Sequence, residues 1–338
     1  MIKEAIARLI EGSHLSESEM VATMEEIMTG AASPAQIGAF LIALRIKGET
    51  VEEITGAARV MREKALKIET PPGAMVVDTC GTGGDSAGTF NISTTAAFVA
   101  AGAGLTVAKH GNKSVSSKSG SADLLQQLGV NIEAEQAKVE ECLRECGIGF
   151  LFAPIMHAAM KYTIGPRREI GARTIFNMLG PLTNPAGARH QVIGVYRDAL
   201  TAPIANVLKR LGAEHVFVVH GHDGLDEVTL TTTTQVSELK NGEVITWAFN
   251  PKEYGFAYCE SEDLKGGDPA ANAKITLDIL TGKERGPKRD VTVINAAFAI
   301  AAGGRSADLK EGITLAQQSL DSGEAMKRLD AMRKITAG

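Results

Sequence analysis

Two glycine-rich loops, each placed directly after a short apolar segment, constrain most strongly what this chain can fold into. The loop Gly81 to Asp85 follows the apolar run 75–77 and precedes an alanine-rich stretch at 96–103. The loop 109–120 follows the segment 105–108 and is rich in lysine, serine and amide side chains. Glycines let the backbone approach a ligand closely, and free N–H groups at a helix start favour an anion. Either loop alone could be an ordinary turn, but the pair predicts a ligand with more than one phosphate.

The chain beyond residue 75 alternates short apolar runs with helical patterns, which predicts an α/β fold with a mostly parallel central sheet. Residues 1–70 contain helical patterns alone, with start signals at Ser16, Ser33 and Thr50. The run Pro71 to Gly73 interrupts these patterns and is the best linker candidate. Strands are expected at 75–79, 105–108, 148–151, 191–196, 215–219, 243–247 and 256–258, and helices at 92–102, 120–128, 136–146, 200–211, 269–281 and 289–302.

Bulk composition excludes several classes of partner. With 338 residues the chain can form one large domain or two ordinary ones. Its net charge of −5 offers no basic field for nucleic acid, and one tryptophan with four tyrosines leaves few rings for bases to stack on. There is no leader pattern and no apolar span of 18 residues. We therefore expect a cytoplasmic protein with no nucleic-acid partner and no membrane partner.

An acidic pair, Asp226 and Glu227, follows the expected strand 215–219. On a loop both carboxylates can turn toward one cleft, and carboxylates together with phosphate oxygens are the ligands that Mg²⁺ takes in phosphate-transfer sites. The alternative is a solvated acidic turn. His220 and His222 could indicate a transition metal, but the pattern supplies no third ligand.

The segment 154–185 places an arginine in an unusual position. Pro166 suits the first turn of a helix, which would put Arg167 at a helix N-terminus. The helix dipole disfavours a cation there, so the arginine points to an anionic ligand or a carboxylate partner. The alternative is a surface arginine paired with a glutamate.

Together these segments resemble the anthranilate phosphoribosyltransferase family of tryptophan biosynthesis, in the family's order and over nearly the whole chain. The matching pieces are Asp78 to Asp85, Asn91 to Thr94, Lys109 to Asn112, Ser116 to Asp123, Gly165 to Asn177, Gly180 to Pro185, Asp223 to Glu227 and Gly266 to Asp268.

The resemblance implies a fold of the nucleoside phosphorylase and phosphoribosyltransferase kind. It consists of a small all-helical domain at 1–70, joined by a discontinuous segment near 166–185, and a large α/β domain at 75–338 that binds the phosphoribosyl donor. The active site would lie in the cleft between the domains. The resemblance also implies a homodimer that forms contacts through the helical domain.

The implied reaction joins the amine of anthranilate to C1 of 5-phosphoribosyl 1-diphosphate and releases diphosphate. The implied catalysis is electrostatic and positional, with no single catalytic residue. Mg²⁺, expected as two ions with the diphosphate, would be held by Ser93, Asp226 and Glu227. Anthranilate would contact Gly81, His110, Asn112, His157, Arg167 and Pro181. The donor would contact Gly81, Gly84, Asp85, Thr89, Asn91, Ser93, Thr94, Lys109, Asn112, Lys113, Ser114, Ser117 and Ser121.

One position departs from the family. Residue 113 is lysine where the family often has arginine, and lysine cannot make a bidentate phosphate contact.

Two other functions remain open at this point. A pyrimidine nucleoside phosphorylase shares this architecture but needs one phosphate and no metal, so the acidic pair and the loop at Lys109 argue against it. A non-catalytic nucleic-acid-binding relative should carry a basic groove, which the negative net charge opposes.

Overall fold

The structure, a computed structural model, describes residues 1–85, 87–114 and 118–337. At its N-terminal end four helices form a bundle: α1 (Ile2–Ile10), α2 (Glu17–Met28), α3 (Pro34–Lys47) and α4 (Val51–Lys64). Ser16, Ser33 and Thr50 each accept a hydrogen bond from the backbone three residues on, in full capping boxes. The three start signals are therefore confirmed, whereas α1 was not predicted.

A seven-stranded sheet forms the centre of the rest of the chain, in the order β3-β2-β1-β4-β5-β6-β7. The first five strands in this order are parallel, and β6 and β7 add an antiparallel edge. The parallel strands read as apolar runs because helices cover both of their faces. The strands are β1 (Val76–Gly81), β2 (Thr106–Gly111), β3 (Ile148–Phe152), β4 (His190–Gly194), β5 (His215–Gly221), β6 (Thr234–Lys240) and β7 (Glu243–Phe249).

Alternate side chains of the sheet belong to two different cores. On β5, Phe217 and Val219 pack with the helices of the C-terminal half, whereas Val216 and Val218 pack with α11 and the N-terminal bundle. The helices beyond α4 are α5 (Ile92–Gly102), α6 (Ser121–Gln127), α7 (Gln136–Glu145), α8 (Ala153–Met156), α9 (Lys161–Ile170), α10 (Phe176–Leu182), α11 (Thr201–Arg210), α12 (Pro269–Leu280), α13 (Pro287–Ala302), α14 (Leu309–Asp321) and α15 (Glu324–Ala337).

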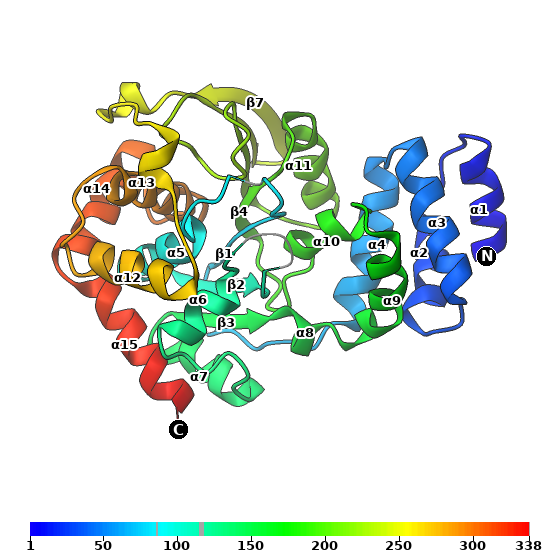
Figure 1. Cartoon of the computed structure of the whole chain (residues 1–338), viewed down its shortest axis with the longest axis horizontal. Helices are drawn as coiled ribbons and strands as arrows, with labels where there is room; N and C mark the ends of the chain where they lie inside the picture. The colour runs from blue at the N-terminus through cyan, green and yellow to red at the C-terminus, as the bar shows by residue number, and fades with distance from the viewer. Residues whose placement is uncertain (86, 115–117, 338) are drawn as a thin grey trace.

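Helices α9 and α10 lie against the N-terminal bundle although they connect β3 to β4. Helix α9 contacts α2 and α3, and α10 contacts α4 (Figure 1). Residues 1–64 and 161–182 are therefore neighbours in space, and the chain between them forms the first three strands of the sheet. No helix of the described residues is both long and apolar enough to span a membrane.

Three local expectations were wrong. Residues 256–258 form no strand, whereas β6, which pairs with β7, was not predicted because its polar start at Thr234 weakened its signal. Helix α9 begins at Lys161, so Pro166 lies inside the helix and not in its first turn. Arg167 consequently sits in the last turn of α9, where the helix dipole favours a cation. The dipole argument for an anionic ligand at Arg167 therefore fails.

Candidate active site

The segments that follow the carboxyl ends of two parallel strands, β1 and β5, meet at one place. The Gly83 N–H donates to Asp226 Oδ2 over 2.7 Å, which joins the loop after β1 to the loop after β5. The Ser93 N–H donates to Glu227 Oε1 over 3.1 Å, which joins the start of α5 to the same acidic pair. Ligands of open α/β sheets bind at this edge, so the geometry gathers an anion-binding helix start and two carboxylates in one site.

Two glycines of the first loop are required by their surroundings. A Cβ at Gly81 would stand 2.6 Å from Asp226 Oδ2, so a side chain there would displace the Asp226 carboxylate. Gly84 has a φ of +83°, a conformation that side chains disfavour, and a Cβ there would lie 2.8 Å from Arg173 Nη2. Arg173 also donates to the Gly84 carbonyl and lies over the ring of Tyr196. The protein's own packing thus gives a sufficient reason for glycine at position 84.

The acidic pair is held with little charge compensation. Burial raises the pKa of Asp226 well above its ordinary value, and the nearby charges of Asp85 and Glu227 raise it further. Burial also raises the pKa of Glu227 to about 7, with Lys109 and Ser93 acting in the opposite direction. No set of three or more histidine, cysteine, aspartate or glutamate side chains in the described part of the chain could hold a metal ion. Two buried carboxyls with raised pKa values fit Mg²⁺, which commonly takes only one or two protein carboxylates and completes its shell with water and substrate phosphates.

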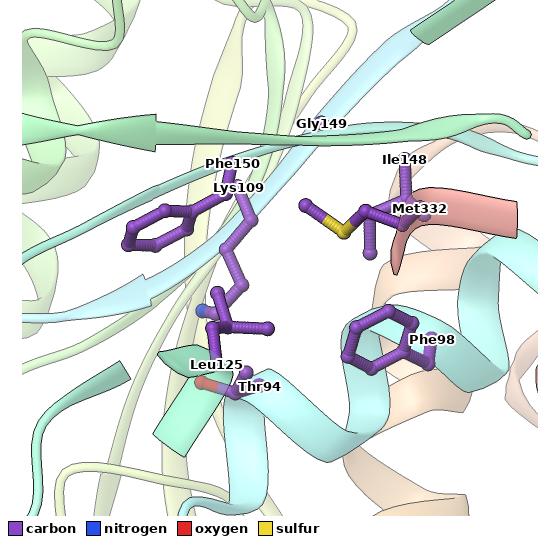
Figure 2. A pocket seen from close by; sticks show the side chains of 8 residues that line it. All are labelled: Thr94, Phe98, Lys109, Leu125, Ile148, Gly149, Phe150 and Met332. Atoms are coloured by element: carbon purple, nitrogen blue, oxygen red, sulfur yellow. The ribbon is translucent and has the colours of Figure 1, made fainter. Parts of the chain in front are cut away.

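Lys109 is a buried cation beneath this pair. Its side chain is 3% exposed, and its amine donates to the Thr79 carbonyl. Figure 2 shows the stem of Lys109 leaving β2 beside Phe150, with its amine directed toward Thr94 at the start of α5. The side chains around the Lys109 stem leave no room for a water molecule, so the stem is held in place. The apolar wall also contains Phe98, Leu125, Ile148 and Met332.

The second glycine-rich loop is closed by hydrogen bonds at its base. Asp123 Oδ2 accepts from the Ser114 N–H over 3.0 Å and from the Gly120 N–H over 2.9 Å. Ser121 Oγ donates to the Asn112 carbonyl over 3.3 Å. Asn112 and Lys113 are exposed at the mouth of this loop. Ser117, a predicted donor contact, lies outside the described residues.

The remaining predicted donor residues lie along the first loop and the start of α5. Asp85 Oδ1 accepts from the Ala87 N–H over 3.2 Å, and Thr89 pairs with Lys265 in an antiparallel bridge. Thr94 is buried, and the side chain of Asn91 hydrogen bonds to Ser119.

Two histidines form a neutral wall on the other side of the site. The rings of His110, from β2, and His157, after α8, lie 5.1 Å apart. Burial lowers the pKa of His110 to about 3 and the pKa of His157 to about 4. His110 Nδ1 lies 3.1 Å from the Gly180 carbonyl, which makes Nδ1 the protonated nitrogen. Its Nε2, like that of His157, is buried without a partner in the described residues. The unprotonated Nε2 of His110 can accept a ligand N–H.

Arg167 lies farther along the small-domain side. Its guanidinium stands 5.2 Å over the ring of Phe176, and burial lowers its pKa from the ordinary value. Within the described residues no hydrogen bond or ion pair joins Arg167 to a carboxylate, so the surface-pair alternative finds no support. Pro181 is buried in α10, where its carbonyl accepts from Gln191 Nε2 over 2.9 Å.

Comparisons with known proteins identify the chain's family. Residues 73–326 match the a/b domain of the glycosyl transferase family, and residues 3–65 match its helical bundle domain. The anthranilate phosphoribosyltransferases of Geotalea uraniireducens and Acetivibrio thermocellus are 54% and 55% identical to the chain. The alignments cover 99% of this chain and 99% and 97% of those proteins. The chain belongs to the anthranilate phosphoribosyltransferase family.

Solved structures of the family confirm the predicted fold class. The anthranilate phosphoribosyltransferase of Thermus thermophilus superposes with a TM-score of 0.94 at 43% identity, covering 99% of both chains. The Saccharomyces cerevisiae enzyme in complex with PRPP and Mg gives a TM-score of 0.90 at 28% identity, covering 99% of this chain and 98% of that one.

Sequence reasoning assigned no role to three residues that organise this site. Asp78, fully buried on β1, accepts from the His110 N–H over 3.1 Å and from Asn184 Nδ2 over 2.7 Å. Asn184 also donates to the Ala108 carbonyl, which ties the segment after α10 to β2. The third residue is Arg173. Asp78 and Asn184 both stand in family motifs, but nothing in a motif says which of its members bond to one another.

Proposed function

We propose that this chain works as a Mg²⁺-dependent anthranilate phosphoribosyltransferase through the residues set out below. The activity is that of its family: transfer of the 5-phosphoribosyl group from 5-phosphoribosyl 1-diphosphate to the amine of anthranilate, with release of diphosphate. The observation that carries the assignment is the meeting of the helix start at Ser93 with Asp226 and Glu227. Two alternatives, a nucleoside phosphorylase and a nucleic-acid-binding protein, give no reason for this acidic pair.

We propose that the donor lies between the two glycine-rich loops. Backbone N–H groups and hydroxyls at the start of α5 suit one phosphate, and the exposed loop carrying Asn112 and Lys113 suits another. Support comes from the Saccharomyces cerevisiae relative, whose structure is a complex with PRPP and Mg. The residues assigned to the donor are Gly81, Gly84, Asp85, Thr89, Asn91, Ser93, Thr94, Lys109, Asn112, Lys113, Ser114, Ser117 and Ser121.

Asp226, Glu227 and Ser93 would hold Mg²⁺, in a site that we propose takes two ions. The metal would neutralise the charge that grows on diphosphate as it leaves. The raised pKa values of both carboxyls support this, since a buried acidic pair without a cation is electrostatically costly. Lys109 keeps a fixed positive charge near Glu227 and favours its ionised form.

The acceptor would lie between the neutral histidines and Arg167. An aromatic amine is uncharged near neutral pH, so it attacks C1 without a strong base while the C1–O bond to diphosphate breaks. Orientation and electrostatic stabilisation then carry the catalysis. Arg167 would bind the carboxylate, and Gly81, His110, Asn112, His157 and Pro181 would line the pocket. Another Saccharomyces cerevisiae structure holds 4-fluoroanthranilate.

We further propose a homodimer formed through the helical domain, which comprises residues 1–70 and the segment near 166–185. Exposed isoleucines on its helices support this: Ile10 is 73%, Ile46 82% and Ile164 57% exposed. Sedimentation of the purified protein tests the oligomeric state, and a monomer at micromolar concentration would contradict the proposal.

One assay tests the whole assignment. Anthranilate fluorescence should fall when the donor and Mg²⁺ are both added, and stay constant when either is left out. Phosphorolysis of a pyrimidine nucleoside in place of this reaction would favour the phosphorylase alternative. Full activity in excess chelator would remove the metal from the proposal.

A further inference from the structure

The motif Gly266 to Asp268 belongs to the chain's family resemblance but has no role in the site described so far. Residues 264–267, here called the strap, run beside the end of the first donor loop. Gly266 N–H donates to the Gly88 carbonyl over 3.0 Å, and Phe90 N–H donates to the Leu264 carbonyl over 3.3 Å. The strap therefore fixes the backbone that leads into α5.

Gly266 shows how closely the strap approaches. A Cβ at this position would lie 2.6 Å from Phe90 N, 2.7 Å from Phe90 Cα and 2.6 Å from Asn272 Oδ1. Its backbone conformation is open to any residue, so close approach is what requires glycine here.

Asn272, on α12, links the strap to both donor loops. It is 1% exposed, its Oδ1 accepts from the Gly267 N–H over 2.7 Å, and its Nδ2 donates to Asn91 Oδ1 over 2.9 Å. Asn91 Oδ1 also accepts from Ser119 Oγ over 3.2 Å, and Asn91 Nδ2 donates to the Ser119 carbonyl over 3.1 Å. A continuous chain of hydrogen bonds thus joins the strap, the start of α5 and the second glycine-rich loop.

This chain of hydrogen bonds determines how the side chain of Asn91 is used at the start of α5, where the donor phosphate is assigned. Asn91 occupies the N-cap of α5, where an asparagine side chain normally accepts an N–H of its own helix. Here it makes no such bond, because its oxygen already accepts from Asn272 and Ser119. The Asn91 side chain therefore does not cap the first turn of α5, where the donor phosphate is assigned, and the side chain that accepts there is Glu227, from the Ser93 N–H.

We propose that Asn272 is a positioning residue for the phosphoribosyl donor: it holds the Asn91 amide away from α5 and fixes the spacing of the two donor loops. The inference rests on the donor site proposed above. Asn272 touches neither substrate in this arrangement and acts through Asn91.

The test compares two alanine variants on the same helix. Asn272→Ala removes the link to Asn91 without adding charge, and we expect the donor KM to rise at least tenfold with the anthranilate KM changed less than twofold. Calorimetric titration of donor with Mg²⁺ should show the same loss of affinity. Thr276→Ala is the control, because Thr276 Oγ1 bonds Thr95 Oγ1 over 3.0 Å between the same two helices. It should lower Tm while leaving both KM values within twofold.

A second pair of variants keeps the inference testable should Asn272→Ala fail to fold. Gly266→Ala should also raise the donor KM selectively, because the added Cβ displaces Phe90 or Asn272. Gly312→Ala is its control: its Cβ would meet the Ala297 carbonyl at 2.9 Å, between α13 and α14. If the Asn272→Ala and Gly266→Ala variants bind the donor normally, or if they bind both substrates more weakly to the same extent, the inference about Asn272 is overturned. The proposed function is not affected by that result. A parent protein that binds no donor would overturn the proposed function as well.

Discussion

The donor side and the acceptor side of the site are stabilised in different ways. On the donor side, buried acidic side chains accept backbone N–H groups from neighbouring loops, as Asp226 does from Gly83 and Glu227 from Ser93. On the acceptor side, the two buried histidines are neutral, and each keeps an Nε2 without a partner in the described residues.

The two sides of the site are therefore arranged differently for the ligands that we assign to them. On the donor side the acidic pair already has its backbone hydrogen bonds, so a cation would add its positive charge to that of Lys109. On the acceptor side, the Nε2 of His110 lacks a hydrogen-bond donor, which a small amine can supply, and the Arg167 guanidinium can donate to a carboxylate. Variants should therefore affect charge balance on the donor side and ligand affinity on the acceptor side, and the four predictions below test that division.

The largest effect is expected at the acidic pair. Asp226→Asn and Glu227→Gln should each reduce kcat by a factor on the order of 100 or more, because stabilisation of the leaving group is lost. At pH 8 neither should lower Tm, because burial disfavours the ionised form of both carboxyls and the amide removes that cost. Steady-state kinetics and thermal melts check both outcomes. Loss of folding in parallel with activity would mean that the pair is structural.

A smaller effect is expected for Arg167 on the acceptor side. Arg167→Ala should raise the anthranilate KM about ten- to a hundredfold, because a charged hydrogen bond contributes roughly 1.5–3 kcal/mol. The donor KM should stay within twofold. Arg168→Ala, at the exposed neighbour on the same helix, is the matched control and should change neither constant. An unchanged anthranilate KM in Arg167→Ala would show that its cation serves only to cover Phe176.

The neutral histidines should make folding stability sensitive to acid. The folded-state pKa values of about 3 for His110 and about 4 for His157 lie below the unfolded value, so the unfolded chain binds more protons as pH falls. The contribution of each histidine to the free energy of unfolding is fully present above pH 6.5. Below pH 6.5 it falls by up to about 1.4 kcal/mol per pH unit for each histidine. Between pH 7 and pH 5, the free energy of unfolding measured in urea should fall less for His157→Gln than for the parent protein. The exposed His222→Gln should lose as much as the parent.

The smallest effect concerns the backbone of the first loop. Gly84→Ala should cost about 1–2 kcal/mol in unfolding free energy, because φ is +83° at that position. Gly83→Ala shares a positive φ of +67° but has open space around its Cβ, so it separates strain from collision with Arg173. Equal losses in the two variants would show that contact with Arg173 is unimportant.

Local signals predicted much of this molecule. The capping boxes at Ser16, Ser33 and Thr50 and the apolar runs of β1 to β5 were predicted because each depends on residues within one turn or one strand. Helix α9 was misplaced because Pro166 favours a first turn in isolation, yet the preceding residues 161–165 are already helical here.

The sequence by itself determined the α/β class, the anion-binding loops and, through six or more motifs in order, the family. Periodicity and glycine placement are local properties, and a motif keeps its residues together. The resemblance already implied that the segment near 166–185 joins the helical domain. Only the tertiary structure decided which helices meet there, that Asp78 bonds Asn184, and that Asn272 holds Asn91. The paired residues of these bonds lie 106 and 181 positions apart, and the closure of such long loops is settled by the packing of whole elements, which no local pattern records.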